Sequence, residues 1–131
     1  MTTHARVCLV DDDIFVRDAL ALGLSDAGYE VLTAPGAAAG FDIVRREPVD
    51  AIVTDMNMPG THGSEFISEL RGQWPRLPIV AISGAATING RSTTDIAAEL
   101  GANTTLIKPF RARALADVLE SILRDGGAPR S

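Results

Sequence analysis

Four apolar runs rich in β-branched residues each end in a polar side chain, and this pattern constrains the fold more than any other feature. The runs and the residues that follow them are Val7–Val10 with Asp11, Ala51–Thr54 with Asp55, Pro78–Ile82 with Ser83, and Leu106–Ile107 with Lys108. Such runs are typical of parallel strands that are buried on both faces. Parallel strands end at the same edge of a sheet, so the four polar groups are predicted to share one crevice there.

Helical patterns separate the strands along the chain. The predicted strands are Arg6–Val10, Glu30–Ala34, Ala51–Thr54, Ile79–Ile82 and a last one ending at Leu106–Ile107. Helices are predicted after Asp13 up to Gly28, at Ala37–Glu47, at Ser64–Gln73, from about Thr93, and along the apolar stripe Leu115, Val118, Leu119 and Ile122. This alternation predicts a three-layer α/β sandwich, with a parallel sheet between two layers of helices.

Asp11, Asp12 and Asp55 would repel one another in a shared crevice unless a cation neutralised them. A cluster made only of oxygen ligands suits a hard ion such as Mg²⁺, whose open positions take water or phosphoryl oxygens. Sharing one ion requires the first and third strands to be neighbours. The flavodoxin-like (βα)5 sheet, with the strand order 2-1-3-4-5, meets this requirement and is the expected arrangement.

Asp55 stands alone at the end of its strand, so it can keep one oxygen free for reaction. Carboxylates act as nucleophiles toward phosphorus and give acyl phosphates. The transfer needs mainly positioning and charge neutralisation, which Lys108 and the metal ion would supply. We therefore expect Asp55 to be the acid that accepts a phosphoryl group.

The ordered set of motifs resembles the receiver domain of two-component response regulators, over roughly residues 6–124. The motifs are Asp11-Asp12, Asp55 followed by Met58-Pro59-Gly60 and Gly63, Ser83, and Lys108-Pro109-Phe110. The resemblance implies these roles: metal binding by Asp11, Asp12 and Asp55, phosphoryl acceptance by Asp55, a metal-binding main-chain carbonyl at Asn57, a switch hydroxyl on Ser83 and a positive partner in Lys108. The resemblance also implies the strand order 2-1-3-4-5. It further implies that the protein promotes phosphorylation and dephosphorylation of its own Asp55 only and is not an enzyme for other substrates.

One departure from the receiver pattern lies three residues before Lys108. Thr105 stands there, where many receiver domains carry a Tyr or Phe whose ring turns inward on activation. The aromatic switch is therefore missing. We hypothesise that coupling runs instead through Ser83 and the loop that follows it.

That loop is the second departure, because residues 84–95 make it a few residues longer than is usual. Asn89-Gly90 predicts a turn, and Ser92 with Asp95 resembles a capping box. The extra length is either a tolerated surface insertion or a mobile segment that reshapes the partner-binding face or controls access to the site. Gly84 leaves little cover beside Ser83, which should admit water and shorten the life of an acyl phosphate.

Charge and composition exclude several classes of function. A net charge of −5, with no basic run longer than Arg45-Arg46, argues against nucleic-acid binding. No segment reaches the roughly 18 apolar residues that membrane insertion requires, and the first residues lack the features of a signal peptide. The single cysteine, Cys8, lies within the first apolar run, which predicts a core thiol and fits a reducing cytoplasm.

A length of 131 residues, 46% of them hydrophobic, predicts a single domain. The resemblance implies that this is a receiver domain at 1–125, followed by a flexible tail at 126–131. Output by protein contact is therefore expected. The phosphoryl donor would be a sensor histidine kinase or a histidine phosphotransfer protein. A downstream protein target would read the surface of the fourth helix, fifth strand and fifth helix. Whether a linker begins at Gly126-Gly127 stays open.

Two alternatives lead to other functions. Asp11 and Asp13 also form an Asp-x-Asp motif, as in Mg²⁺-dependent phosphatases of the haloacid dehalogenase type, where Asp11 would be the nucleophile. Those enzymes need a further acidic pair after the lysine, whereas Asp117 and Glu120 are predicted on the last helix, and Asp55 would have no task. The other alternative is a receiver-like scaffold that never accepts phosphate, against which the complete set of acids, hydroxyl and lysine argues.

Overall fold

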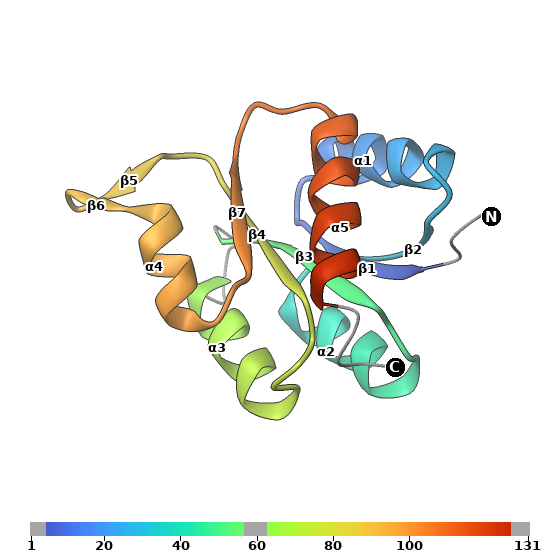
Figure 1. Ribbon diagram of the computed structural model, residues 1–131, viewed down its shortest axis with the longest axis horizontal. Helices are drawn as coiled ribbons and strands as arrows, with labels where there is room; N and C mark the ends of the chain where they lie inside the picture. Colours follow the sequence, from blue (N-terminus) through green and yellow to red (C-terminus); the bar gives the residue numbers. More distant parts are fainter. Residues whose placement is uncertain (1–4, 57–62, 127–131) are drawn as a thin grey trace.

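A computed structural model describes residues 5–56 and 63–126 of the chain. The described residues form one sheet of five strands, β1 (Arg6–Val10), β2 (Glu30–Ala34), β3 (Ala51–Asp55), β4 (Ile79–Ser83) and β7 (Thr104–Ile107). The helices between and after them are α1 (Ile14–Asp26), α2 (Ala37–Arg46), α3 (Gly63–Gln73), α4 (Thr93–Leu100) and α5 (Ala112–Gly126). A small hairpin of β5 (Thr87–Ile88) and β6 (Arg91–Ser92) precedes α4 (Figure 1).

The strands of the sheet lie in the order β2-β1-β3-β4-β7 and all neighbouring pairs are parallel. Since β7 is the fifth strand of this sheet, the predicted order 2-1-3-4-5 and the flavodoxin-like fold are confirmed. The winding reverses between β1 and β3, because β2 follows β1 on one side and β3 lies on the other. In open parallel sheets this reversal opens a crevice at the carboxyl ends of the two strands.

Alternate residues of each strand pack into two apolar layers, one on each face of the sheet. Val7 and Leu9 of β1 pack with Leu24 of α1 and Leu115 of α5. Cys8 and Val10 point the other way, into a layer covered by α2, α3 and α4. Burial on both faces explains why the interior strands β1, β3 and β4 read as continuous apolar runs. The helices on the two faces confirm the predicted three layers (Figure 1).

The element ends follow local signals in the sequence. Asp13 caps α1, since its Oδ1 accepts hydrogen bonds from the amides of Phe15 and Val16 at 2.9 and 3.2 Å. Gly28 follows the same helix with a φ of 101°, a conformation that favours glycine. The last helix continues to Gly126, the first residue of the predicted tail, and residues 127–131 lie outside the described part.

The longer loop after β4 is an ordered hairpin. Asn89 and Gly90 both have positive φ, 52° and 81°, as a two-residue type I′ hairpin turn requires. Ser92 then caps α4 by accepting a hydrogen bond from the amide of Asp95, which confirms the predicted start of this helix. The sequence predicted the turn but not the two short strands, because two residues are too few to show an alternating pattern.

Cys8 is completely buried in the core, as predicted. Burial raises the pKa of its thiol to about 12, so the thiol stays neutral and unreactive. Among the described residues, no helix combines the length and the hydropathy needed to cross a bilayer.

Helix α1 lies very close to α5 at Gly23. A methyl group placed on Gly23 would lie 2.2 Å from Cβ of Ala112, a distance that real side chains do not reach. The two helices therefore pack at a separation that only glycine permits at this position.

Substituting Gly23 by Ala should destabilise the protein by about 1–3 kcal/mol, because α5 must move away from α1 to admit the methyl group. Gly72, in α3, is a matched control, since a methyl group there would meet nothing within 4 Å. Gly72→Ala should stabilise the protein by up to about 1 kcal/mol through helix propensity. Urea unfolding of both variants measures the difference, and equal stabilities would contradict the close packing.

Candidate functional site

The carboxyl ends of β1 and β3 bring three acids together, as the sequence predicted. Asp11 follows β1 directly, Asp12 comes next, and Asp55 is the last residue of β3. One carboxylate oxygen from each of the three lies within 4.8 Å of the others. Asp11 and Asp55 are buried, with 0% and 4% of their surface exposed, while Asp12 is exposed. The cluster has one solvent-facing side.

Asp11 is the most constrained of the three acids. Its Oδ1 accepts a hydrogen bond from the amide of Asp13 at 2.9 Å, whereas its buried Oδ2 has no hydrogen-bond partner among the described residues. Burial raises the pKa of Asp11, and the charges of Asp55 and Asp12 raise it further, against the lowering effects of the Asp13 amide and Lys108. A buried carboxylate oxygen without a donor is costly.

A metal ion would relieve this cost. The three carboxylates supply hard oxygen ligands, Asp12 leaves the cluster open to water, and Oδ2 of Asp11 accepts no hydrogen bond from the described residues. Divalent ions such as Mg²⁺ are commonly held by one or two carboxylates, with water and phosphate oxygens in the remaining positions. The donor set therefore fits a metal site.

Lys108 supplies the positive charge of the crevice. It follows β7, and its Nζ donates a hydrogen bond to Oδ2 of Asp55 at 2.9 Å and lies 3.7 Å from Oδ2 of Asp11. Burial alone would lower the pKa of Lys108, but the hydrogen bond and charge of Asp55, with the charge of Asp11, raise it by more. The ammonium group therefore stays charged at physiological pH.

Ser83 reaches the same edge of the sheet, but its hydroxyl is turned toward the following loop. The side chain is fully buried, and Oγ donates to the carbonyl of Ala85 at 2.7 Å. Thr93, the first residue of α4, donates its own hydroxyl to the same carbonyl at 2.9 Å. No local sequence pattern predicted a role for Thr93, because its contact depends on how the hairpin folds back.

Thr105 and Asn57 are the two remaining residues that the sequence analysis singled out. Thr105 lies on β7, and its buried Oγ1 has no hydrogen-bond partner within the described part of the chain. Asn57, expected to offer a main-chain carbonyl to the metal, lies outside the described residues, as do the Met58-Pro59-Gly60 motif and His62. The role of Asn57 stays a prediction.

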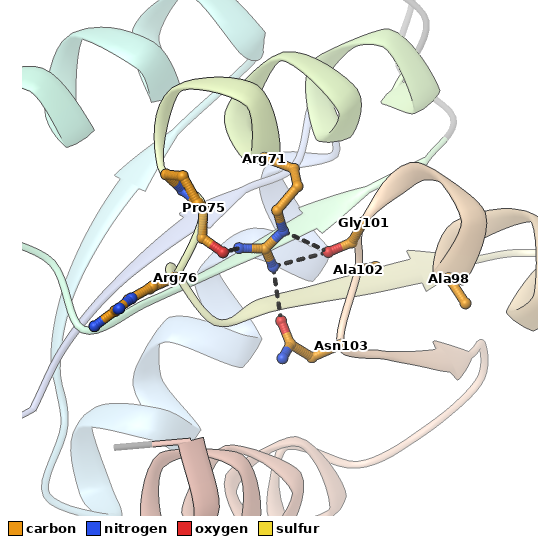
Figure 2. Close-up of a pocket in the computed structure, with 7 residues that line it drawn as sticks. All are labelled: Arg71, Pro75, Arg76, Ala98, Gly101, Ala102 and Asn103. Carbon is orange, nitrogen blue, oxygen red and sulfur yellow. Dashed lines mark hydrogen bonds between the residues drawn. The ribbon is translucent and has the colours of Figure 1, made fainter. Parts of the chain in front are cut away.

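A pocket of about 520 Å³ lies at the opposite edge of the sheet, where β4 and β7 begin (Figure 2). Arg71 occupies its wall and donates to the carbonyls of Gly101, Trp74 and Pro75 and to Oδ1 of Asn103, at 2.8–3.1 Å. All five N–H groups of the guanidinium are thereby used on the protein itself. The pocket is thus part of a structural junction and lies roughly 16 Å, the length of a five-residue strand, from the acids.

The sheet order and the acidic crevice beside a lysine define the class of protein, a small α/β module with the CheY-like flavodoxin fold. The chain belongs to the family of response regulator receiver domains, whose family profile matches residues 7–120. This is a family of signalling switches controlled by phosphorylation and is not a classical enzyme family. The resemblance inferred from the motifs is confirmed.

Individual relatives agree with the family assignment. The response regulator protein FleR of Pseudomonas aeruginosa is 34% identical over 115 residues, which cover 88% of this chain and 24% of FleR. The transcriptional regulatory protein PrrA of Mycobacterium tuberculosis is 33% identical over 126 residues, covering 96% of this chain and 53% of PrrA. The chain therefore spans only about a quarter to a half of the length of these two relatives.

A solved structure matches over its whole length. The chemotaxis response regulator CheY4 of Vibrio cholerae superposes with a TM-score of 0.82 at 32% identity, covering 92% of this chain and 100% of CheY4. These matches give no support to the alternative of a haloacid dehalogenase-type phosphatase. In agreement, Asp117 and Glu120 lie on α5 and do not join the acidic cluster.

Replacing Asp11 by Asn should stabilise the protein at pH 7 when EDTA is present, by on the order of 1 kcal/mol, because a buried charge is removed. The pKa of Asp11 is higher in the folded protein than its ordinary value of 3.8. The carboxylate therefore destabilises the fold above that raised pKa, and the penalty disappears as the pH falls toward 3.8. The advantage of Asp11→Asn should shrink in the same direction.

Excess Mg²⁺ should stabilise the parent protein and remove the advantage of Asp11→Asn, because an ion that binds only the folded state stabilises it. Thermal unfolding with EDTA and with Mg²⁺ measures both effects. Asp42→Asn, which removes an exposed carboxylate of α2, is the control and should respond to neither. A parent protein that unfolds at the same temperature with EDTA and with Mg²⁺ would contradict a metal site.

Proposed function

We propose that Asp55 accepts a phosphoryl group and that this modification changes which proteins the chain binds. The observation that carries the proposal is the hydrogen bond of Lys108 to Asp55 at 2.9 Å, next to the carboxylates of Asp11 and Asp12. Asp55 thus contacts a charged ammonium group and also lies within 4.8 Å of two carboxylates that are candidate metal ligands. This combination favours phosphoryl chemistry, in which positioning and charge neutralisation supply most of the catalysis.

Each residue of the crevice has a distinct task in this proposal. An oxygen of Asp55 forms a bond to phosphorus while the phosphorus–nitrogen bond of a donor phosphohistidine breaks, and the imidazole leaves with the electron pair. Lys108 balances the negative charge on the phosphoryl oxygens. Asp11 and Asp12, with Asp55 and the main-chain carbonyl of Asn57, would hold Mg²⁺, which supplies further charge neutralisation when bound.

Asp55 suits the acceptor role better than Asp11. Oδ1 of Asp11 accepts a hydrogen bond from the amide of Asp13, and its Oδ2 is buried and accepts no hydrogen bond within the described part of the chain. Asp55 keeps slight exposure at the end of β3 and lies beside the ammonium group that would stabilise the product. The chain would promote the phosphorylation and dephosphorylation of its own Asp55 only, so it would not be an enzyme for other substrates.

The partners follow from the family and from the surface charge. Receiver domains interact with kinases and with downstream effectors. The donor for this chain would be a sensor histidine kinase or a histidine phosphotransfer protein, and a protein target would read the surface of α4, β7 and α5. A net charge of −5 fits protein partners in the cytoplasm and disfavours direct contact with nucleic acid.

Incubation with acetyl phosphate and Mg²⁺ tests the acceptor directly. We expect intact-mass spectrometry to find one added phosphoryl group on the parent protein and none on Asp55→Asn, because the nucleophilic oxygen is lost. Asp42→Asn should be phosphorylated like the parent. Chelation of Mg²⁺ should slow the reaction by at least about tenfold, since charge neutralisation of this kind contributes several kcal/mol.

The same experiment separates the alternatives. Continuous release of phosphate over many turnovers, retained by Asp55→Asn and lost in Asp11→Asn, would support a phosphatase. The absence of any mass change would support a scaffold that does not accept phosphate. Either result would overturn the proposal.

Gly84 offers a separate prediction on the lifetime of the acyl phosphate. A methyl group at this position would meet nothing within 4 Å, so Gly84→Val fits without a clash. The larger side chain should shield the acyl phosphate from water and lengthen its half-life several-fold. The decay of the phosphorylated fraction after removal of acetyl phosphate measures the effect, with Gly72→Ala as the control for a distant glycine. A half-life no longer than that of the parent would show that Gly84 does not set water access.

A further inference from the structure

The hydroxyl of Ser83 is committed to the loop that follows it. Oγ donates to the carbonyl of Ala85 at 2.7 Å and accepts from the amide of Ala85 at 3.1 Å. A serine hydroxyl carries a single hydrogen. It therefore cannot donate to a phosphoryl group on Asp55 while it donates to Ala85, and it must release this carbonyl before it can take part in a switch.

The carbonyl of Ala85 has a second donor in Thr93. The Thr93 hydroxyl lies 2.9 Å from the oxygen of Ala85 and 3.1 Å from the oxygen of Ala86, and the Thr93 amide donates to Ala86 at 2.9 Å. Thr93 is completely buried, whereas Ala85 and Ala86 are exposed. The Thr93 hydroxyl, which carries a single hydrogen, lies closer to the Ala85 carbonyl, while the Thr93 amide serves the Ala86 carbonyl, so one buried residue holds two carbonyls of an exposed loop.

The contact is also the base of the hairpin. The hairpin leaves the fold at Ala86 and returns at Thr93, where α4 begins. Arg91 of β6 forms an ion pair with Glu99 of α4, so the returning strand is tied to the helix. The position of the Ala85 carbonyl is therefore linked to the position of the hairpin and of the first turn of α4.

We infer that Thr93 is a positioning residue for the switch, one whose hydroxyl keeps the Ala85 carbonyl within reach of Ser83. The contact favours the resting arrangement, in which the Ser83 hydroxyl is turned away from Asp55. This inference rests on the proposed phosphorylation of Asp55. The shared carbonyl of Ala85 supplies a route by which Ser83 and α4 influence each other.

The inference has a thermodynamic consequence. A ligand that needs the Ser83 hydroxyl binds only the fraction of molecules in which Ala85 has been released, and its apparent affinity falls in proportion to that fraction. Removing the Thr93 hydroxyl weakens the resting arrangement by about one hydrogen bond. The apparent affinity should then rise about fivefold, the factor that corresponds to a bond of ordinary net strength.

Beryllofluoride with Mg²⁺, a non-covalent mimic of an acyl phosphate, is the probe for this measurement. Its dissociation constant is determined by nuclear magnetic resonance titration for the parent, Thr93→Val and Thr93→Ser. Thr93→Val keeps the shape but loses the hydroxyl, and it should bind about fivefold more tightly. Thr93→Ser keeps the hydroxyl and should bind like the parent, which separates the hydrogen bond from packing.

A double-mutant cycle with Ser83→Ala tests the route of the coupling. In the Ser83→Ala background no hydroxyl has to leave Ala85, so Thr93→Val should change the affinity little. An equal gain in both backgrounds would overturn the inference, as would unchanged or weaker binding by Thr93→Val. If Thr93→Val does not fold, Thr93→Ala replaces it. The parent protein alone also tests the inference, because beryllofluoride should shift the amide resonances of Ala85 and Thr93. Resonances that do not shift would overturn the inference.

The outcomes distinguish this inference from the proposed function. The proposed phosphorylation of Asp55 would be contradicted if the parent protein did not bind beryllofluoride. It would also be contradicted if the Asp55→Asn variant bound beryllofluoride as tightly as the parent. Binding that depends on Asp55 but not on Thr93 leaves the proposed function standing and removes only the role of Thr93.

Discussion

The mutual repulsion of three carboxylates at the ends of β1 and β3 is the constraint on which the rest of the structure depends. Backbone geometry brings these acids within 4.8 Å of one another, and burial deprives two of them of water. Lys108 offsets part of the repulsion from the end of β7. The acidic cluster therefore attracts cations. A bound or attached group that changes the charge of the cluster affects side chains at the ends of three strands, β1, β3 and β7.

The elements around the crevice differ in how firmly they are held. Asp11 directly follows β1 and Asp55 ends β3, and these two interior strands are packed on both faces by apolar layers. The segment after Ser83 is instead exposed and is held by hydroxyl contacts to two carbonyls. A change of charge at Asp55 can thus leave the sheet in place while altering the hydrogen bonds of this segment, which is the division that a switch requires.

The sequence predicted the fold and the composition of the crevice because both depend on patterns within short segments. Continuous apolar runs located three of the strands and the end of the last one, and the polar residue after a run located Asp11, Asp55 and Lys108. Other features depend on tertiary contacts that no local pattern encodes. The turned hydroxyl of Ser83, the contact of Thr93 with Ala85 and the close approach of Gly23 to α5 all belong to this group.

The junction around Arg71 has a geometric consequence for α4. Its guanidinium fastens the carbonyl of Gly101, which directly follows the helix, with two hydrogen bonds. A tilt of α4 would therefore pivot at Gly101, and displacement would increase with distance from it. An eight-residue helix is about 12 Å long, so a tilt of roughly 10° would shift its first turn by about 2 Å. The hairpin of β5 and β6 precedes that turn, so its tip would be displaced further than the first turn itself.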